Sequence, residues 1–176
     1  CPESCDLTIN GDVSDVFKTI GAKFRPVNFD RSGMNPLSDM LLLFKLMKLI
    51  IKEQPDIVLN YTIKATIYGS IAAYLCKTSK ITSNITGLGY VFTRTGFFAQ
   101  IIQFIVTLQY MIALRFNDVI FFQNSDDLSL FAAKGIIRDS SKTKILNGSG
   151  VNLELFSPDN NVDKIPQSFI FVGRLL

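Results

Sequence analysis

Short apolar runs alternate with longer amphipathic segments along most of the chain. In the short runs Val, Ile, Leu and Phe stand next to one another, which is typical of buried strands. In the longer segments apolar residues recur every three or four positions, which predicts helices. The predicted strands are residues 23–29, 56–61, 80–86, 118–123, 143–146 and 168–172. The predicted helices are residues 12–20, 35–52, 65–77, 96–116 and 125–134.

This alternation predicts the class of fold. Strands that alternate with helices of such length favour right-handed βαβ units, and therefore a parallel sheet. Near-continuous apolar runs, which strands buried on both faces require, include Val58, Ile120, Phe121, Ile170 and Phe171. We therefore expect an α/β fold, with a Rossmann-like parallel sheet covered by helices on both faces.

A polar stretch near the carboxyl terminus predicts a domain boundary. Residues 156–167 contain Pro158 and Pro166 together with several Asp and Asn residues, which favour turns. We predict one domain over residues 1–160, and over residues 161–176 a linker and the first strand of a second domain. Because the chain begins with Cys1 rather than Met, we expect its amino terminus to be cut.

Composition excludes several classes of function. Hydrophobic residues make up 48% of the 176 positions and charged residues 19%, which is enough apolar material for a sizeable core. The net charge of +3 is too small to indicate binding to nucleic acid. The sequence contains no His, which excludes a Ser-His-Asp arrangement and a His-rich zinc site within it. The odd count of 3 cysteines indicates free thiols in a reducing, cytoplasmic location.

One predicted helix raises the question of membrane contact. Residues 97–114 carry no charge, and about 18 apolar residues is the lower limit for a spanning helix. Polar side chains interrupt this segment, however, and Arg94 and Arg115 flank it symmetrically. We interpret it as a helix that covers the sheet, with insertion into a membrane interface as the alternative. The same two readings apply to residues 40–52, where Lys45, Lys48 and Lys52 are interleaved with apolar residues.

Polar or glycine-rich segments follow the predicted strands. In an open parallel sheet, ligands bind beyond the carboxyl ends of the strands. Turn chemistry alone explains any one of these segments, but together they favour one shared crevice. They are residues 62–64, 87–90, 123–124, 147–151 and 173–174. The Gly87-x-Gly89 pair has no third glycine at the dinucleotide-binding spacing, so a nicotinamide site is only weakly indicated.

Several motifs, taken together, carry a resemblance to a known family. They are DRSGMNP (residues 30–36), PDIVLNYTIK (55–64), YGSIAA (68–73), NITGLGY (84–90), FQN (122–124), GSGVNLELFSP (148–158) and FVGRLL (171–176). In these motifs the chain resembles family-four retaining glycosyltransferases of the GT-B type. It is most similar to the group that builds bacterial capsule and exopolysaccharide.

The resemblance implies two Rossmann-like domains that face each other across a cleft. The first binds the acceptor, a saccharide that is often linked to a polyprenyl diphosphate. The second binds a nucleotide-diphosphate sugar, and neither a cofactor nor a metal is required. Arg174 matches the family's arginine that holds the diphosphate leaving group, so the resemblance makes it the catalytic and donor-binding candidate. A planar guanidinium suits this role because it can pair with two oxygens of the departing group.

The remaining candidate residues are assigned by role. Those expected to line the acceptor side are Arg31, Asn35, Thr62, Lys64, Gly87, Gly89, Gln123 and Asn124. Those expected to shape the turn toward the second domain are Gly148, Gly150 and Val151. Asn35 could equally cap the helix that begins at Pro36.

Two alternatives remain at this point. One is a nucleotide-sugar 2-epimerase of the same fold, which would need acidic and His groups near the cleft, and this segment has no His. The other is a non-catalytic half of a split transferase. The family's partner lysine and its Glu-x7-Glu motif would lie beyond Leu176, so we expect this segment to be inactive alone. We expect the whole protein to be cytoplasmic, with peripheral contact at the inner membrane face.

Overall fold

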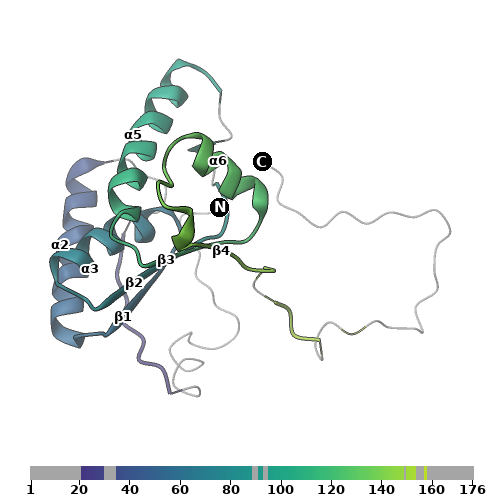
Figure 1. Cartoon of the computed structure of the whole chain (residues 1–176). Helices are drawn as coiled ribbons and strands as arrows, with labels where there is room; N and C mark the ends of the chain where they lie inside the picture. The colour runs from purple at the N-terminus through teal and green to yellow at the C-terminus, as the bar shows by residue number, and fades with distance from the viewer. Residues whose placement is uncertain are drawn as a thin grey trace, which may run out of the picture.

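The computed structural model describes residues 21–29, 35–88, 91–92, 95–148, 150–153 and 157 (Figure 1). The helices are α2 (Pro36–Glu53), α3 (Ser70–Leu75), α5 (Phe97–Leu114) and α6 (Ser125–Ala133). Two short elements of other helical types are the π-helix η1 (Ala65–Gly69) and the 3₁₀ helix η2 (Ser140–Lys142). The strands are β1 (Ile57–Tyr61), β2 (Lys80–Ile85), β3 (Val119–Phe122) and β4 (Thr143–Ile145).

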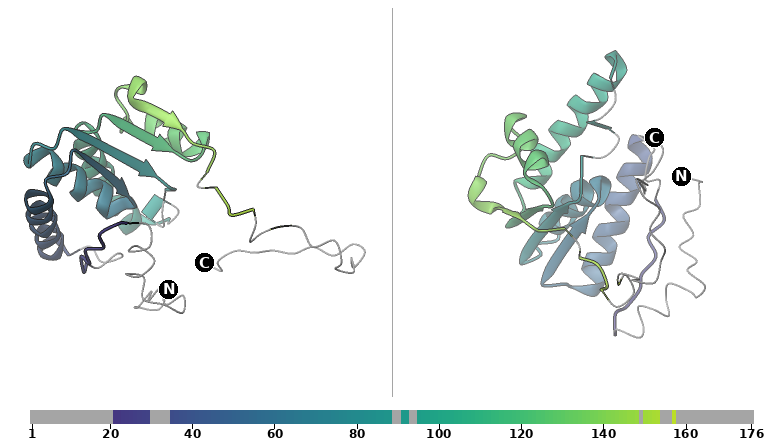
Figure 2. Two further views of the ribbon diagram at one scale, coloured as in Figure 1. Left: turned by 90° about the horizontal axis from the view of Figure 1, so that it is seen from below. Right: turned by 90° about the vertical axis from the view of Figure 1, so that its right-hand side faces the viewer.

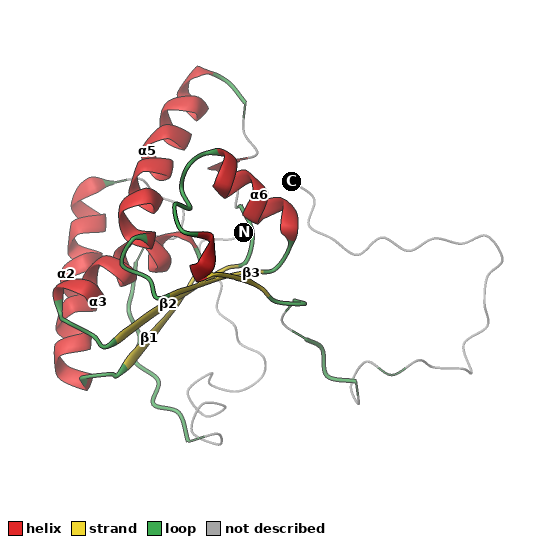
Figure 3. Ribbon diagram, in the orientation of Figure 1, coloured by secondary structure: helices red, strands yellow, loops and turns green. Residues whose placement is uncertain are grey.

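The four strands form one parallel sheet in the order β1-β2-β3-β4 (labelled in Figure 1; strands are yellow in Figure 3). In the register, Tyr61 lies beside Asn84, and Asn84 lies beside Phe121. The carboxyl ends of the strands therefore meet at a single edge of the sheet. The α/β fold is confirmed, as are four of the five predicted strands that lie within these residues.

The described helices cover one face of the sheet, whereas we expected helices on both (Figure 2). On the helical face Ile81, Ser83 and Ile85 are buried, while Leu59 on the opposite face is 50% exposed. The reason is topological. Each right-handed crossover leads to the next strand on the same side, and the strand order never reverses, so every connection falls on one face.

The strand predicted at residues 23–29 is wrong, because this described segment has no regular structure. Pro26 has no N–H to donate to a neighbouring strand. The segment is held instead beside the end of α2, where Arg25 Nε donates to Glu53 Oε1 at 2.9 Å. The helix predicted at residues 12–20, the strand at 168–172 and the domain boundary near residue 160 lie outside the described residues.

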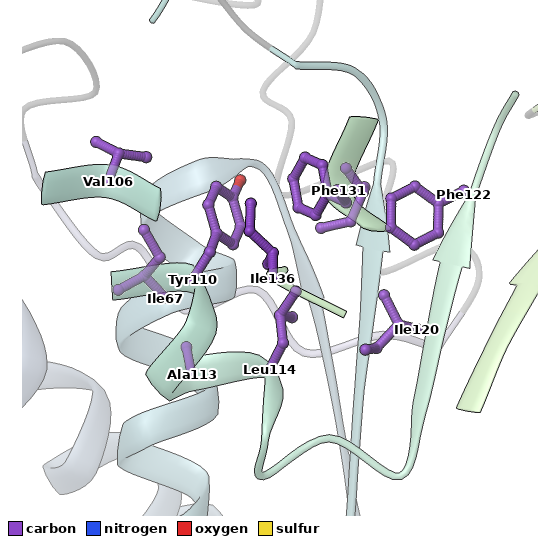
Figure 4. Close-up of a cluster of buried hydrophobic side chains, with 10 residues drawn as sticks. Ile67, Val106, Tyr110, Ala113, Leu114, Ile120, Phe122, Phe131 and Ile136 are labelled. Carbon is purple, nitrogen blue, oxygen red and sulfur yellow. The ribbon is translucent and has the colours of Figure 1, made fainter. Parts of the chain in front are cut away.

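The core lies between the sheet and the carboxyl-terminal half of α5 (Figure 4). The Phe131 ring of α6 packs edge-on against Tyr110 of α5 and Phe122 of β3, with ring centroids 5.1 and 5.3 Å apart. Aromatic pairs in this geometry stabilise a core beyond the burial of their area alone. These contacts fix α5 and α6 above the sheet.

A buried polar network joins β1, β2 and α3. Asn60 Nδ2 donates to Ser70 Oγ at 3.2 Å, and Asn117 Nδ2 donates to the same oxygen at 2.9 Å. Ser83 Oγ lies 3.3 Å from Ser70 Oγ. Gly69 is required beside this network, because a Cβ at that position would overlap the side-chain oxygen of Asn60. These hydrogen bonds join the elements of the network, although the buried Asn117 Oδ1 has no partner among the described residues.

Candidate functional site

The turn after β1 carries unusual backbone geometry. Thr62 directly follows the strand and has a φ of 70°, in the left-handed region. A β-branched residue rarely adopts this conformation, which costs about 1–2 kcal/mol. Strain of this kind gathers at functional sites, where the surrounding structure maintains it. It therefore marks the carboxyl edge of the sheet as the candidate site.

A π-helix continues the chain from this turn. The element η1 covers Ala65–Gly69 and runs directly into α3. Single π-turns are rare and occur frequently at functional sites, since the extra residue changes where side chains point. Lys64, which stands immediately before η1, is thereby placed at the same edge as Thr62.

Lys64 belongs to a partly buried network that joins three helical elements. Its Nζ donates to Asp39 Oδ1 of α2 at 2.7 Å, and the two side chains are only 13% and 15% exposed. The hydroxyl of Tyr68, in η1, donates to Asp39 Oδ2 at 2.9 Å. Gln109 Nε2 of α5 donates to the Tyr68 oxygen at 3.2 Å. The ammonium is thus held by a carboxylate whose second oxygen is also occupied.

Burial raises the pKa of Tyr68 to about 12, and the hydrogen bond to Asp39 acts in the same direction. Loss of the phenolic proton would place a second negative charge next to the Asp39 carboxylate. The hydroxyl therefore stays protonated at neutral pH and acts as a fixed donor within the network.

Two asparagines predicted to line the site act as helix caps. The Asn35 side-chain oxygen accepts from Leu37 N at 3.0 Å at the start of α2. The Asn124 side-chain oxygen accepts from Asp127 N at 2.7 Å at the start of α6. Each cap satisfies a backbone donor that the helix leaves free. For Asn35 this agrees with the capping role that the sequence left open, and acceptor contact by either residue stays a prediction.

The other predicted residues follow the remaining strands at the same edge. Gly87 comes after β2 and Gln123 after β3. Gly148 and Gly150 follow β4 with φ values of 78° and 77°, a conformation that favours glycine, and Val151 beside them is exposed. Arg31, Gly89 and Arg174 lie outside the described residues. The described candidates thus share one edge, although their contacts with a ligand stay predictions.

Sequence reasoning missed Asp39, Tyr68 and Gln109. Asp39 lies in the first turn of α2, where an acidic residue is expected from the helix dipole alone. Its contact with Lys64 spans 25 positions of the sequence, and the contact between Gln109 and Tyr68 spans 41. No local pattern connects residues that far apart. Only the packing of α2, η1 and α5 brings them together.

Among the residues that the structure describes, no three His, Cys, Asp or Glu side chains gather in a way that could hold a metal ion. That the protein needs neither a metal nor a cofactor stays a prediction.

Comparison with known families decides the relationship of the chain. The family model described as "Glycosyl transferase 4-like" matches residues 5–124, which contain the strained turn, η1 and the Lys64 network. The chain belongs to this family. The sequence resemblance to family-four glycosyltransferases is thereby confirmed.

A curated relative of this glycosyl transferase 4-like chain is known from Campylobacter jejuni subsp. jejuni serotype O:2. It is named N,N'-diacetylbacillosaminyl-diphospho-undecaprenol alpha-1,3-N-acetylgalactosaminyltransferase, and it is 23% identical over 141 residues. The match covers 80% of this chain and 37% of the relative. The chain therefore spans well under half the length of that protein.

Among solved structures, the chain is similar to S. aureus MnaA in its co-structure with UDP. The TM-score is 0.51 at 17% sequence identity, over 86% of this chain and 38% of that one. A likeness at this identity concerns the fold alone. It agrees with the open parallel α/β sheet of this chain.

Proposed function

We propose that the whole protein transfers a sugar from a nucleotide-diphosphate sugar to a lipid-linked saccharide, and that the described residues hold the acceptor. The observation that carries this proposal is the strained Thr62 turn, continued by η1 and the Lys64 network, at the carboxyl edge of the sheet. The name of the Campylobacter relative, which specifies a diphospho-undecaprenol acceptor, supports this class of substrate.

The proposed reaction replaces one bond to the anomeric carbon of the donor sugar by another. The bond to the diphosphate oxygen breaks, an acceptor hydroxyl oxygen forms the new glycosidic bond, and the hydroxyl proton passes to a base. Negative charge develops on the leaving diphosphate, which Arg174 would pair with through its guanidinium. Retention of configuration at that carbon is part of the proposal.

The projecting end of α5 supports contact with a membrane. Because α5 follows β2, its first turns lie at the same edge as the candidate site. Phe98 and Phe104 are 79% and 70% exposed there, and α5 is apolar and long enough to cross a membrane. Only 22% of the residues of that helix are buried, whereas most residues of a helix in the core of a globular protein are buried. We propose that this end lies in the membrane interface on the cytoplasmic side, where a polyprenyl diphosphate is anchored.

The proposed function is tested by release of nucleoside diphosphate from a panel of nucleotide sugars by the full-length protein. The assay is run with and without membrane lipid extract, for the wild type and for Arg174→Ala. We expect lipid-dependent release that falls by a factor on the order of 10² or more in the variant. Absence of release with every sugar, or equal rates for the two proteins, would contradict the proposal.

A further inference from the structure

We propose that Lys64 recognises a neutral hydroxyl group of the acceptor sugar rather than the acceptor's diphosphate, and that Asp39 and Tyr68 are the positioning residues that hold it. The inference rests on the proposed function. It specifies which part of a lipid-linked saccharide binds at the carboxyl edge of the sheet.

The first argument is charge. The ammonium of Lys64 lies 2.7 Å from a carboxylate oxygen, and neither side chain is more than 15% exposed. The two opposite charges of this pair nearly cancel, so a ligand meets almost no net charge. Because the pair is partly buried, its charges are screened less than exposed charges are. A diphosphate that approached Lys64 would also approach Asp39, and like charges disfavour that position. Uncharged oxygens carry no such penalty.

The second argument is the supply of hydrogen-bond donors. A lysine ammonium has three N–H groups, and within the described residues Asp39 is the partner that Lys64 engages. Asp39 Oδ2 is occupied by Tyr68, and the Tyr68 oxygen accepts from Gln109. The Lys64 N–H groups are therefore the part of the network with capacity for a further acceptor oxygen. A sugar hydroxyl is such an oxygen.

The third argument is rigidity. Lys64 donates to Asp39 of α2, Tyr68 of η1 donates to the other oxygen of Asp39, and Gln109 of α5 donates to Tyr68. Lys64 is therefore held directly by Asp39, which the other two residues fix in place. A flexible lysine behaves as a mobile point charge, which suits phosphate, whereas a fixed donor can select one hydroxyl by its position. Lys64 stands two positions after the strained Thr62, so the donor is held at the ligand edge.

The test measures the half-saturating concentration of acceptor for the full-length protein. The probe is the pool of polyprenyl-diphosphate-linked saccharides extracted from source membranes, titrated by diphosphate content at saturating nucleotide sugar. The variants are Lys64→Met, which removes the donor, Lys64→Gln, which keeps an uncharged donor, and Asp39→Asn, which removes the carboxylate charge. Lys52→Met, on an exposed position of α2, is the matched control.

We expect the half-saturating concentration to rise at least tenfold in Lys64→Met and Asp39→Asn and less than about threefold in Lys64→Gln. The half-saturating concentration of nucleotide sugar should stay unchanged in all three. A general loss of folding would instead lower the maximal rate and leave the half-saturating concentrations of both substrates at the wild-type values.

The inference is overturned if Asp39→Asn lowers the half-saturating concentration of acceptor, because release of the lysine charge would then favour an anion. It is equally overturned if Lys64→Gln is as impaired as Lys64→Met. If the wild type itself shows no acceptor-dependent turnover, the proposed function fails, and the inference fails with it. The two failures are therefore distinguishable.

Discussion

At the scale of single residues, Thr62 and Tyr68 lie near the carboxyl edge of the sheet, and each has a feature that costs free energy in folding. Thr62 maintains a left-handed backbone, and Tyr68 keeps a hydroxyl in a partly buried network. Neither feature is needed to build a parallel sheet. Both features fix the shape of the turn after β1, where we propose that the acceptor binds.

Replacement of Thr62 by Gly should stabilise the fold while it impairs function. Glycine adopts a positive φ without steric cost, so we expect the free energy of unfolding to rise by up to about 1 kcal/mol. Thr86→Gly is the matched control at an exposed threonine without a positive φ, and it should destabilise the protein. Denaturant unfolding measures both. A destabilised Thr62→Gly variant would contradict strain at this turn.

Tyr68 should make stability sensitive to alkaline pH. Its pKa is raised from 10.0 to about 12 by burial and by Asp39, so the native state binds the proton more tightly than the unfolded state does. The stabilisation is complete below pH 10 and is lost as pH rises through about 12. The stability difference between wild type and Tyr68→Phe, measured by urea unfolding, should therefore shrink over this range. A difference that is constant with pH would show that burial and Asp39 do not raise the pKa of Tyr68.

At the scale of elements, α5 has two halves with different roles. Its carboxyl-terminal half supplies Tyr110, Ala113 and Leu114 to the core, whereas its first turns carry exposed phenylalanines. Gln109 lies in the carboxyl-terminal half, directly before Tyr110, and donates a hydrogen bond to Tyr68. The helix thus links the surface that we propose contacts lipid with the edge that we propose binds the saccharide.

The projecting end of α5 should determine binding to lipid vesicles. Burial of each phenylalanine in a membrane interface is worth about 2 kcal/mol, so Phe98→Ser with Phe104→Ser should reduce partitioning of the full-length protein more than tenfold. Leu153→Ser is the control, because Leu153 is equally exposed on another part of the surface. Flotation with phosphatidylglycerol vesicles measures the effect. Equal flotation of both variants would exclude α5 as the contact.

At the scale of the whole molecule, local pattern predicted most of the elements but not how they meet. Residues 56–61 and 118–123 were predictable as strands because their apolar runs are bounded by polar turns. The segment 23–29 has a similar pattern, and it failed as a strand prediction since strand formation depends on a neighbour for its hydrogen bonds. Coverage of a single face likewise follows from strand order, which residue pattern does not encode.

The candidate site divides in the same way. Thr62 and Lys64 were predictable because they follow a strand, and this position alone places them at the ligand edge of a parallel sheet. Asp39 and Gln109 were not, because their roles depend on contacts between helices far apart in the sequence. Because of the ion pair with Asp39, Lys64 is a fixed hydrogen-bond donor rather than a free cation.

The most direct test of acceptor binding at this edge is photo-crosslinking from Tyr61, which ends β1 and is 48% exposed. Benzoylphenylalanine at this position in the full-length protein would be irradiated with labelled lipid-linked saccharide or with labelled nucleotide sugar. The same group at Lys52, beyond the amino-terminal edge of the sheet, is the control. We predict that position 61 captures the lipid-linked saccharide and position 52 captures neither ligand. Capture of nucleotide sugar alone at position 61, or of saccharide equally at both positions, would contradict an acceptor site at the carboxyl edge.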